Sequence, residues 1–320
     1  MKNFCCPNCH FELVFLKEER GFLVCKNINC SLAIKRFPLF YEIPVLIPFG
    51  AKNCILEKTI ERNFINFGIK KRAKDSKLKV LNDFIRNFLI GSNIVSIKNY
   101  QYLLQNLKYK NNVLIVGGGT VGSGSDKFFL GCKNNSVEIE SIDIYFSKNI
   151  TAIADAHYLP FKDNKFDLVI IQAVLEHVIN PNKVVSEISR VLKKGGIIYA
   201  ETPFMQNVHE GAYDFSRFSH SGHRYLFKDF YEIESGYISG AFSSVLFISS
   251  YAISGLLRNN NIGKVLRLLL SRIFRILDGI TPDKFNYDVG CGFYFIGKQN
   301  LKSKDNINLI DLPKYYRGGQ

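Results

Sequence analysis

The sequence predicts an α/β fold in which a parallel sheet, with helices on both faces, follows a small cysteine-rich module. From Asn112 onward, strand patterns alternate with helix patterns, which indicates a parallel sheet. The apolar run 113–116 leads directly into a glycine cluster, as a buried strand does when it ends in a tight turn. A content of 47% hydrophobic and 22% charged residues is typical of a globular chain.

Residues 1–50 are the first predicted unit. Cys6 and Cys9 form a C-x2-C pair, and Cys25 and Cys30 form a C-x4-C pair, with two short strand patterns between the pairs. Four thiolates carried on two turns are the tetrahedral donor set that Zn²⁺ prefers. We therefore predict a zinc site, with His10 as an alternative fourth ligand. The other reading is two pairs of buried cysteines without a metal.

This unit ends in the segment 36–48, which reads R-F-P-L-F-Y-E-I-P-V-L-I-P. Together with the cysteine pairs, the segment resembles the Trm112-like zinc-ribbon family, whose members end in a similar way. A cysteine-rich ribbon also begins a group of ribosomal RNA guanine methyltransferases, but those continue differently after the last ligand. The resemblance implies a zinc ribbon at the N-terminus.

Residues 51–111 are predicted to be a helical linker at the edge or entrance of the sheet. One helical stripe runs through 81–89, and Leu103, Leu104 and Leu107 indicate a second helix. The basic run 70–74 is interpreted as a solvated turn rather than a nucleic-acid patch.

Gly117, Gly119 and Gly122 form the pattern G-x-G-x-x-G after the first strand. Without a Cβ, such residues let the backbone turn sharply and approach a ligand. The backbone N–H groups of the turn favour a polar or anionic nucleotide. The next predicted strand ends in Asp143, whose carboxylate can accept hydrogen bonds from ribose hydroxyls. Both NAD and S-adenosylmethionine (SAM) remain possible at this point.

Residues 155–196 decide between the two cofactors. They carry D-A-H-Y-L-P-F, F-D-L-V, V-L-E-H-V and E-I-S-R-V-L-K-K-G-G in this order. Asn180 and Pro181 predict the start of a helix, and Gly195 its end. The ordered run resembles the class I SAM-dependent methyltransferases. This resemblance implies a Rossmann-like sheet, SAM as the methyl donor, and a domain over 112–300 with a polar tail at 301–320.

The resemblance also implies roles for individual residues. The glycine loop would lie against the methionine part of SAM, Asp143 at the ribose, and Asp155 at the adenine amino group. Ala156 would contact the adenine through its backbone, and Gln172 would close the methionine end. Ile115 departs from the family, which commonly has an acidic residue there, and the glycine loop is one residue longer than usual.

A stretch that combines polar and aromatic residues, 203–224, follows the fifth predicted strand. It lies beyond the carboxyl end of that strand, where open α/β sheets bind ligands. We predict a substrate lid, with His209 or His223 as general base and Arg217 or Arg224 as anion clamp. The alternative is a polar surface loop. The spacing of the histidines does not indicate a metal motif.

The C-terminal part contributes two further predictions. The uncharged segment 235–257 is interrupted by serines and glycines, which argues against a membrane span. Residues 262–277 predict a basic amphipathic helix that either contacts an anionic membrane or packs on the domain with its basic face in water. Its cations are Lys264, Arg267, Arg272 and Arg275. The segment 292–297 is predicted to be a closing antiparallel strand.

The net charge of +14 favours an acidic partner or surface. The N-terminus lacks an apolar signal core, and the paired cysteines suit a reducing compartment, so we expect a cytoplasmic protein. Peripheral contact with the inner face of the membrane is one alternative for it. The predicted activity is methyl transfer to an oxygen or nitrogen of a small molecule or glycan, with a sugar or other cell-envelope precursor preferred. RNA methylation and a non-catalytic adaptor remain as alternatives.

Overall fold

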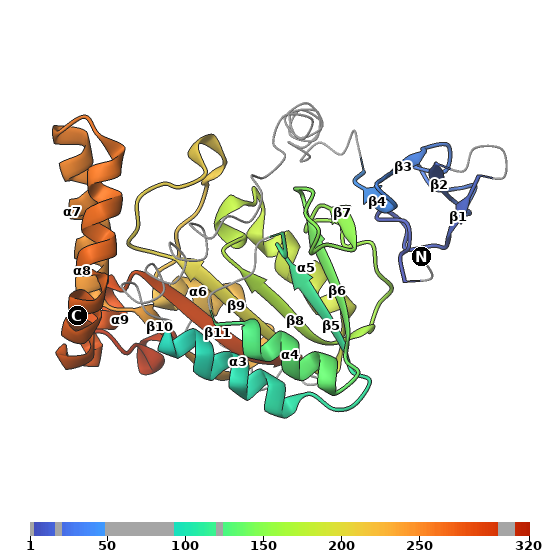
Figure 1. The fold of residues 1–320 in the computed structure, drawn as a ribbon. Helices are drawn as coiled ribbons and strands as arrows, with labels where there is room; N and C mark the ends of the chain where they lie inside the picture. The colour runs from blue at the N-terminus through green and yellow to red at the C-terminus, as the bar shows by residue number, and fades with distance from the viewer. Residues whose placement is uncertain (1–2, 17–20, 49–92, 120–123, 300–310) are drawn as a thin grey trace.

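The computed structural model describes residues 3–16, 21–48, 93–119, 124–299 and 311–320. Within them, one sheet of 11 strands has the order β1-β2-β3-β4-β7-β6-β5-β8-β9-β11-β10 (Figure 1). The predicted stripe at 81–89 and Gly122 lie outside the described residues.

The centre of the sheet is parallel. β5 pairs with β6 on one side and β8 on the other, β6 pairs with β7, and β8 pairs with β9, all in parallel. β11 then pairs antiparallel with β9, and β10 antiparallel with β11. The predicted parallel sheet and its antiparallel closing strand are therefore confirmed. The bounds are β5 (Asn112–Val116), β6 (Glu138–Asp143), β7 (Ala152–Ala154), β8 (Phe166–Gln172), β9 (Leu192–Pro203), β10 (Phe230–Ser239) and β11 (Gly292–Gln299).

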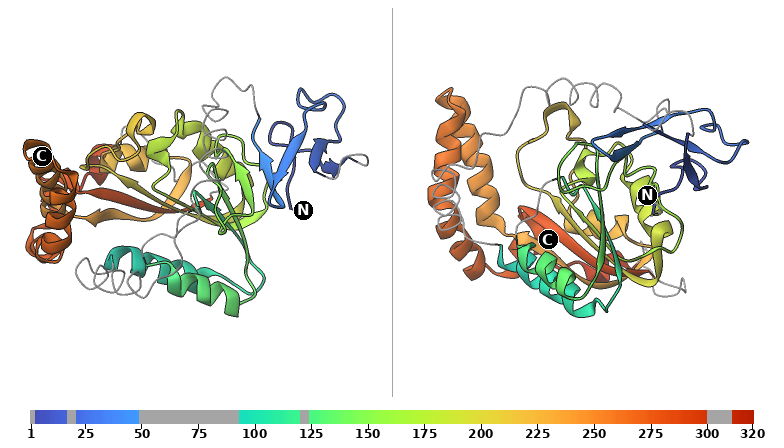
Figure 2. Two further views of the ribbon diagram at one scale, coloured as in Figure 1. Left: turned by 45° about the horizontal axis from the view of Figure 1, so that its top comes forward. Right: turned by 45° about the vertical axis from the view of Figure 1, so that its right-hand side comes forward.

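Helices cover both faces of this sheet (Figures 1 and 2). Successive residues of β5 point to opposite faces, so Val113 packs with α3 and α4 whereas Leu114 packs with α5 and α6. Leu103, on the predicted second helix of the linker, is buried in the α3 layer. The bounds are α3 (Ile94–Asn106), α4 (Asp126–Asn134), the short η1 (Leu175–His177), α5 (Pro181–Val191), η2 (Gly211–Tyr213) and α6 (His220–Leu226).

Helix α5 begins where the sequence predicts, because the Asn180 side chain accepts a hydrogen bond from the Lys183 N–H at 3.0 Å. Its predicted end at Gly195 is wrong, since the helix ends at Val191. Leu192 already pairs with Phe166 of β8, so strand pairing takes over from the helix. Gly195 instead occupies a left-handed turn with φ of 76°.

The cysteine-rich module is joined to the main sheet. Its last strand, β4 (Ile43–Leu46), pairs in parallel with β7 through Val45 opposite Ile153 and Leu46 opposite Ala154. Phe37 and Leu46 belong to the same hydrophobic cluster as Leu114. The module therefore extends the edge of the sheet and its core (Figure 2). Its other strands are β1 (Leu13–Phe15), β2 (Phe22–Cys25) and β3 (Phe37–Phe40).

A helical hairpin stands at the opposite end of the sheet from this module (Figure 1). It consists of α7 (Ala241–Leu256) and α8 (Asn260–Ile280), followed by α9 (Asp283–Val289), and the short η4 (Leu312–Tyr315) lies near the C-terminus. The predicted helix at 262–277 is part of α8. Among the helices that the structure describes, none is long and apolar enough to cross a membrane.

Candidate active site

A cavity of about 350 Å³ opens at the carboxyl ends of β5, β6, β7 and β8. The order of the parallel strands reverses between β5 and β8, and open α/β sheets bind ligands at such a point. The cavity is lined both by residues that were predicted to bind the cofactor and by one that was predicted to act on the acceptor, namely Gly117, Asp143, Asp155, Ala156, Gln172 and His209.

Close packing requires glycine in the turn that follows β5. Gly117 has φ of +81°, and a Cβ at that position would lie 2.2 Å from Val174 Cγ2. A Cβ on Gly118, which the sequence pattern did not single out, would lie 2.0 Å from Ser141 Oγ, and one on Gly119 2.6 Å from Asp143 Oδ2. The turn thus lies directly against the end of β6.

Asp143 ends β6 at the mouth of this turn. Its Oδ2 accepts a hydrogen bond from the Gly119 N–H at 2.8 Å, and its Oδ1 accepts one from the Tyr145 N–H at 2.9 Å. Burial raises the pKa of Asp143, although these backbone donors act in the opposite direction. The carboxylate is held in one orientation at the predicted ribose position.

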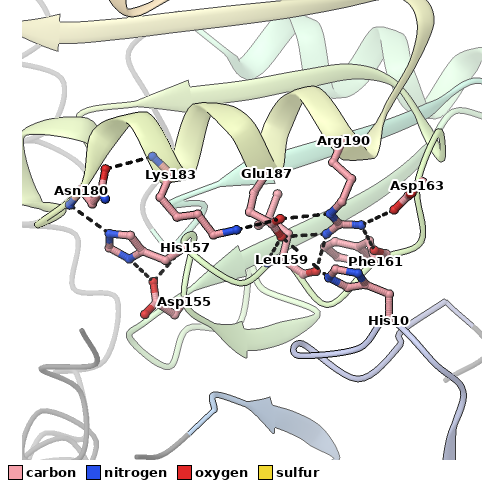
Figure 3. A network of polar contacts seen from close by, with 10 residues as sticks. All are labelled: His10, Asp155, His157, Leu159, Phe161, Asp163, Asn180, Lys183, Glu187 and Arg190. Carbon is pink, nitrogen blue, oxygen red and sulfur yellow. Dashed lines mark hydrogen bonds and ion pairs between the residues drawn. The ribbon is translucent and has the colours of Figure 1, made fainter. Parts of the chain in front are cut away.

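One carboxylate oxygen of Asp155 accepts hydrogen bonds, and the other has no hydrogen-bond partner among the described residues. Its Oδ1 accepts hydrogen bonds from the His157 backbone N–H at 2.9 Å and from His157 Nδ1 at 2.6 Å. His157 Nε2 in turn accepts from the Asn180 N–H at 3.2 Å, which fixes the tautomer (Figure 3). Oδ2 is buried without a hydrogen bond, at a residue that is 3% exposed. A buried carboxylate oxygen needs a donor, and an exocyclic amino group such as that of adenine fits this need.

The loop that carries Asp155 is held by α5 (Figure 3). Glu187 Oε2 accepts from the Leu159 N–H at 3.0 Å, and Arg190 donates to the carbonyls of Leu159 at 3.0 Å and Phe161 at 2.7 Å. Glu187 and Arg190, the E-x-x-R pair of α5, therefore bind the L-P-F segment that follows Asp155. His10 of the cysteine-rich module also approaches this network, with Nε2 4.0 Å from Glu187 Oε2.

Gln172 ends β8 between this cavity and a second one of about 540 Å³. The Tyr100 hydroxyl of α3 donates to Gln172 Oε1. Glu201, at the end of β9, also lines the second cavity and accepts from Ser96 Oγ at 2.9 Å. Burial raises the pKa of Glu201. Sequence analysis overlooked this residue, although an acidic side chain at a strand end was a visible signal.

The predicted acceptor side of the cavity lies where the 203–224 stretch contacts η1. The Glu176 carbonyl accepts from the N–H groups of Phe215 at 2.7 Å and Ser216 at 3.2 Å. His177 Nδ1 lies 2.8 Å from the Tyr213 carbonyl oxygen. These contacts bring His209 over η1, although 32 positions separate it from His177.

Three side chains meet there. His177 Nε2 and His209 Nε2 lie 2.9 Å apart, and each lies 3.6 Å from Glu176 Oε1. Glu176 is 0% exposed, and within the described part of the chain neither of its carboxylate oxygens has a hydrogen bond. The Glu176 carboxylate raises the pKa of His209. Glu176 and His177 were overlooked as site residues, although the V-L-E-H-V motif contains both.

The other predicted acceptor residues lie away from the cavity. Arg217 donates to both carboxylate oxygens of Asp214, with Nη2 2.6 Å from Oδ2. His223 is 0% exposed within α6, and burial lowers its pKa to about 3. Arg224 Nε donates to Glu232 Oε2 at 2.7 Å. The geometry therefore favours His209 over His223 as the base.

The four predicted zinc ligands converge in the N-terminal module. Cys6 Sγ lies 3.8 Å from Cys30 Sγ, and Cys9 Sγ lies 3.4 Å from Cys25 Sγ. All four sulfur atoms lie within 4.8 Å of one another. Zn–S bonds of about 2.3 Å give tetrahedral edges of about 3.8 Å, so the donor set fits zinc. The predicted alternative ligand His10 does not belong to this group.

Comparisons with known proteins agree with this site. Residues 121–200 match the family model described as a methyltransferase domain. The ubiquinone/menaquinone biosynthesis C-methyltransferase UbiE of Neisseria meningitidis is 27% identical over 177 residues, which is 48% of this chain and 72% of that protein. An uncharacterized protein of Methanocaldococcus jannaschii, MJ1123, is 52% identical over 46 residues; the chain spans only 22% of its length.

Among solved structures, phosphoethanolamine N-methyltransferase 2 of Haemonchus contortus in complex with SAM has a TM-score of 0.44 and 17% identity, covering 75% of this chain and 60% of that chain. A Haloferax volcanii complex of the Trm112 methyltransferase activator with a methyltransferase has a TM-score of 0.39 and 15% identity, covering 62% of this chain and 88% of that chain.

The sheet order, the glycine turn and the carboxylate-lined cavity define an α/β protein with a cavity at the edge of the sheet where such folds bind ligands. The methyltransferase-domain match over residues 121–200 and the similarity to the UbiE relatives support a class I SAM-dependent methyltransferase.

Proposed function

We propose that this methyltransferase methylates a hydroxyl group of a sugar or another cell-envelope precursor. The observation that carries the proposal is the His209 imidazole beside the buried Glu176 carboxylate, at the edge of the cofactor cavity. A hydroxyl acceptor benefits from a general base, because its oxygen is a weak nucleophile until it loses its proton. An imidazole backed by a carboxylate can accept that proton and remain stabilised as an imidazolium.

The residues of the chain mainly bind and orient. When bound, SAM supplies a methyl group that is already electrophilic, so proximity and alignment provide most of the acceleration. Asp155 Oδ2 and the Asp143 carboxylate would hold the adenine and the ribose, and Gln172 the methionine end. His209 Nε2 would take the proton of the acceptor hydroxyl while the hydroxyl oxygen attacks the methyl carbon.

The test is methyl transfer from labelled SAM to fractionated cell extract. Label in lipid-linked or free glycan would support the proposal. Label in RNA, with binding that weakens with salt at a slope of about −0.7 per phosphate contacted, would support the RNA alternative. Because the UbiE relatives are named C-methyltransferases, a quinone-precursor fraction is a further arm, and label only there would overturn the hydroxyl proposal. SAM binding by calorimetry without transfer to any fraction would indicate an adaptor.

We also propose that the four-cysteine group binds one zinc ion with a structural role. The module contributes Phe37 and Leu46 to the main core, so loss of the ion should loosen the edge of the sheet. We expect one equivalent of zinc per chain by elemental analysis, and a lower melting temperature after chelation. Less than half an equivalent, with all thiols freely titratable, would contradict the proposal.

A third proposal concerns the α7–α8 hairpin, which we propose contacts an anionic membrane. Apolar side chains form an exposed stripe along α8, namely Val265, Leu269, Ile273, Ile276 and Ile280, with exposed fractions between 51% and 74%. Lys264 lies on the same helix, whereas Arg267 lies over the Phe247 ring of α7, with its guanidinium carbon 5.2 Å from the ring centroid. Basic residues on a helix with an exposed apolar stripe complement anionic lipid.

Sedimentation with liposomes tests this contact. Binding should rise with the anionic lipid fraction and disappear when Lys264, Arg267, Arg272 and Arg275 are replaced by Gln. Replacing Leu269 and Ile273 by Ser should weaken binding without changing the charge. Equal pelleting with neutral lipid, or none at low salt, would mean that the hairpin serves the fold alone.

A further inference from the structure

Glu176, His177 and His209 have the spacing of a set of metal ligands. The three ligand atoms form a triangle with sides of 2.9, 3.6 and 3.6 Å. A cation bonded to nitrogen and oxygen at about 2.0–2.2 Å requires ligand atoms about 3.0–3.6 Å apart at the usual angles. A single point close to the plane of this triangle therefore lies at bonding distance from all three atoms.

The hydrogen bonds behind the two imidazoles direct their lone pairs toward that point. His177 Nδ1 faces the Tyr213 carbonyl oxygen at 2.8 Å, which only an N–H can satisfy, so Nε2 carries the lone pair. His209 Nδ1 faces Asp214 Oδ2 at 3.4 Å, which favours the same tautomer. A carbonyl or carboxylate behind a histidine in this way is the usual outer contact of a metal-binding imidazole.

The charges around the triangle also favour a cation. Glu176 is fully buried, and neither of its carboxylate oxygens has a hydrogen bond to a residue that the structure describes. The nearby Asp214 carboxylate is compensated by Arg217, which donates to both of its oxygens. Two nitrogen lone pairs and a carboxylate that face one point repel one another unless a proton or a metal cation lies between them.

We propose that Glu176, His177 and His209 bind a divalent transition-metal ion. Two imidazoles and one carboxylate suit Zn²⁺, Mn²⁺, Fe²⁺ or Co²⁺ and leave open coordination positions. The proposed site lies beside the predicted cofactor residues, because His177 and His209 line the same cavity as Asp143 and Asp155.

The open positions would take a hydroxyl oxygen of the acceptor, and this part rests on the proposed function. A cation lowers the pKa of an oxygen ligand, so the hydroxyl would lose its proton to water while its oxygen attacks the methyl carbon. The electron pair of the broken C–S bond stays on the sulfur. In the metal-loaded protein the cation, rather than the His209 imidazole, would activate the acceptor.

The experiment measures metal binding by the full chain, independently of methyl transfer. Protein carrying its first equivalent of zinc is titrated with Co²⁺, and binding is followed by visible absorption and by elemental analysis. A site with two nitrogen and one oxygen ligands gives weak visible d–d bands. Cobalt at the cysteine group would instead add intense thiolate-to-metal bands in the near ultraviolet, so the two sites are distinguishable. We expect one cobalt per chain at the site without thiolates.

His209→Gln and Glu176→Gln should each weaken this cobalt binding at least tenfold. Glu210→Gln removes a carboxylate from the same loop but outside the triangle and serves as the matched control. His209 is partly exposed, so its variant is expected to fold even if the buried Glu176 variant does not. No cobalt site beyond the cysteines, or equal affinity in wild type and His209→Gln, would overturn the proposal. Methyl transfer from labelled SAM, measured on the same samples, reports separately on the proposed function.

Discussion

Two pairs of histidines from one part of the chain have opposite environments. His177 and His209 lie at the edge of the cofactor cavity, with their Nε2 atoms 2.9 Å apart beside a buried carboxylate. His220 and His223 of α6 are 2% and 0% exposed, and burial lowers the pKa of each to about 3. The same residue type is thus placed for proton or metal chemistry in one pair and for packing in the other.

The difference arises from the backbone around each pair. The segment with His209 is held over η1 by hydrogen bonds to the Glu176 carbonyl. His220 begins a helix whose N-cap, Ser219, accepts from the Gly222 N–H. That helix turns His223 against the ring of Phe227, with centroids 5.3 Å apart. Backbone hydrogen bonds therefore place His209 at the cavity, whereas helix α6 places His220 and His223 in the core.

The largest expected effect is on turnover. His209→Ala should lower turnover by about 10²–10⁴-fold, the usual contribution of a positioned acid–base group, while SAM affinity stays within about twofold. Arg217→Ala should lower turnover less, because it frees Asp214 behind His209 without removing the imidazole. His10→Ala, a histidine outside the cavity, is the matched control. If the His209 and Arg217 variants both keep full activity on the true acceptor, the 203–224 stretch is structural.

The buried pair should instead determine the acid stability. His220 and His223 stay neutral in the folded state but take up protons near pH 6.5 when unfolded, so stability falls as the pH drops below about 6.5. From pH 7.5 to 5.5 the two together should lower the free energy of unfolding by about 2–3 kcal/mol. Urea unfolding at both pH values measures this. A His220→Gln, His223→Phe double variant should show a smaller pH dependence, and an unchanged one would contradict the assignment.

A smaller effect should appear on the cofactor side of the cavity. Asp155→Ala and Asp143→Ala should each weaken SAM binding by about 10- to 100-fold, because each removes a charge-assisted hydrogen bond of about 1.5–3 kcal/mol. The exposed Asp163→Ala is the control, and calorimetric titration is the measurement. Neither cofactor variant should change the acid stability described above. NAD binding without SAM binding would reverse the choice of cofactor.

Most of the cofactor side could be predicted because its residues stand next to strand ends. Gly117, Asp143 and Gln172 each stand at or just after the end of a strand whose apolar pattern is visible in the sequence, and parallel strands bring their carboxyl ends to one edge. Asp155 was assigned by the family resemblance instead. The start of helix α5 could likewise be predicted from its Asn180 N-cap. Its end was misplaced because pairing of Leu192 with β8 outweighs the glycine signal at Gly195.

By itself, the sequence determined the class of the protein and the cysteine set, and it predicted where a cofactor would bind, since each depends on residues close together in the chain or on strand ends. Only the tertiary structure decided which histidine faces the cavity, and that β4 joins the sheet beside β7. The meeting of His177 with His209 depends on where a 32-residue excursion returns to η1. That return is set by backbone hydrogen bonds to Glu176, which leave no periodic pattern in the sequence.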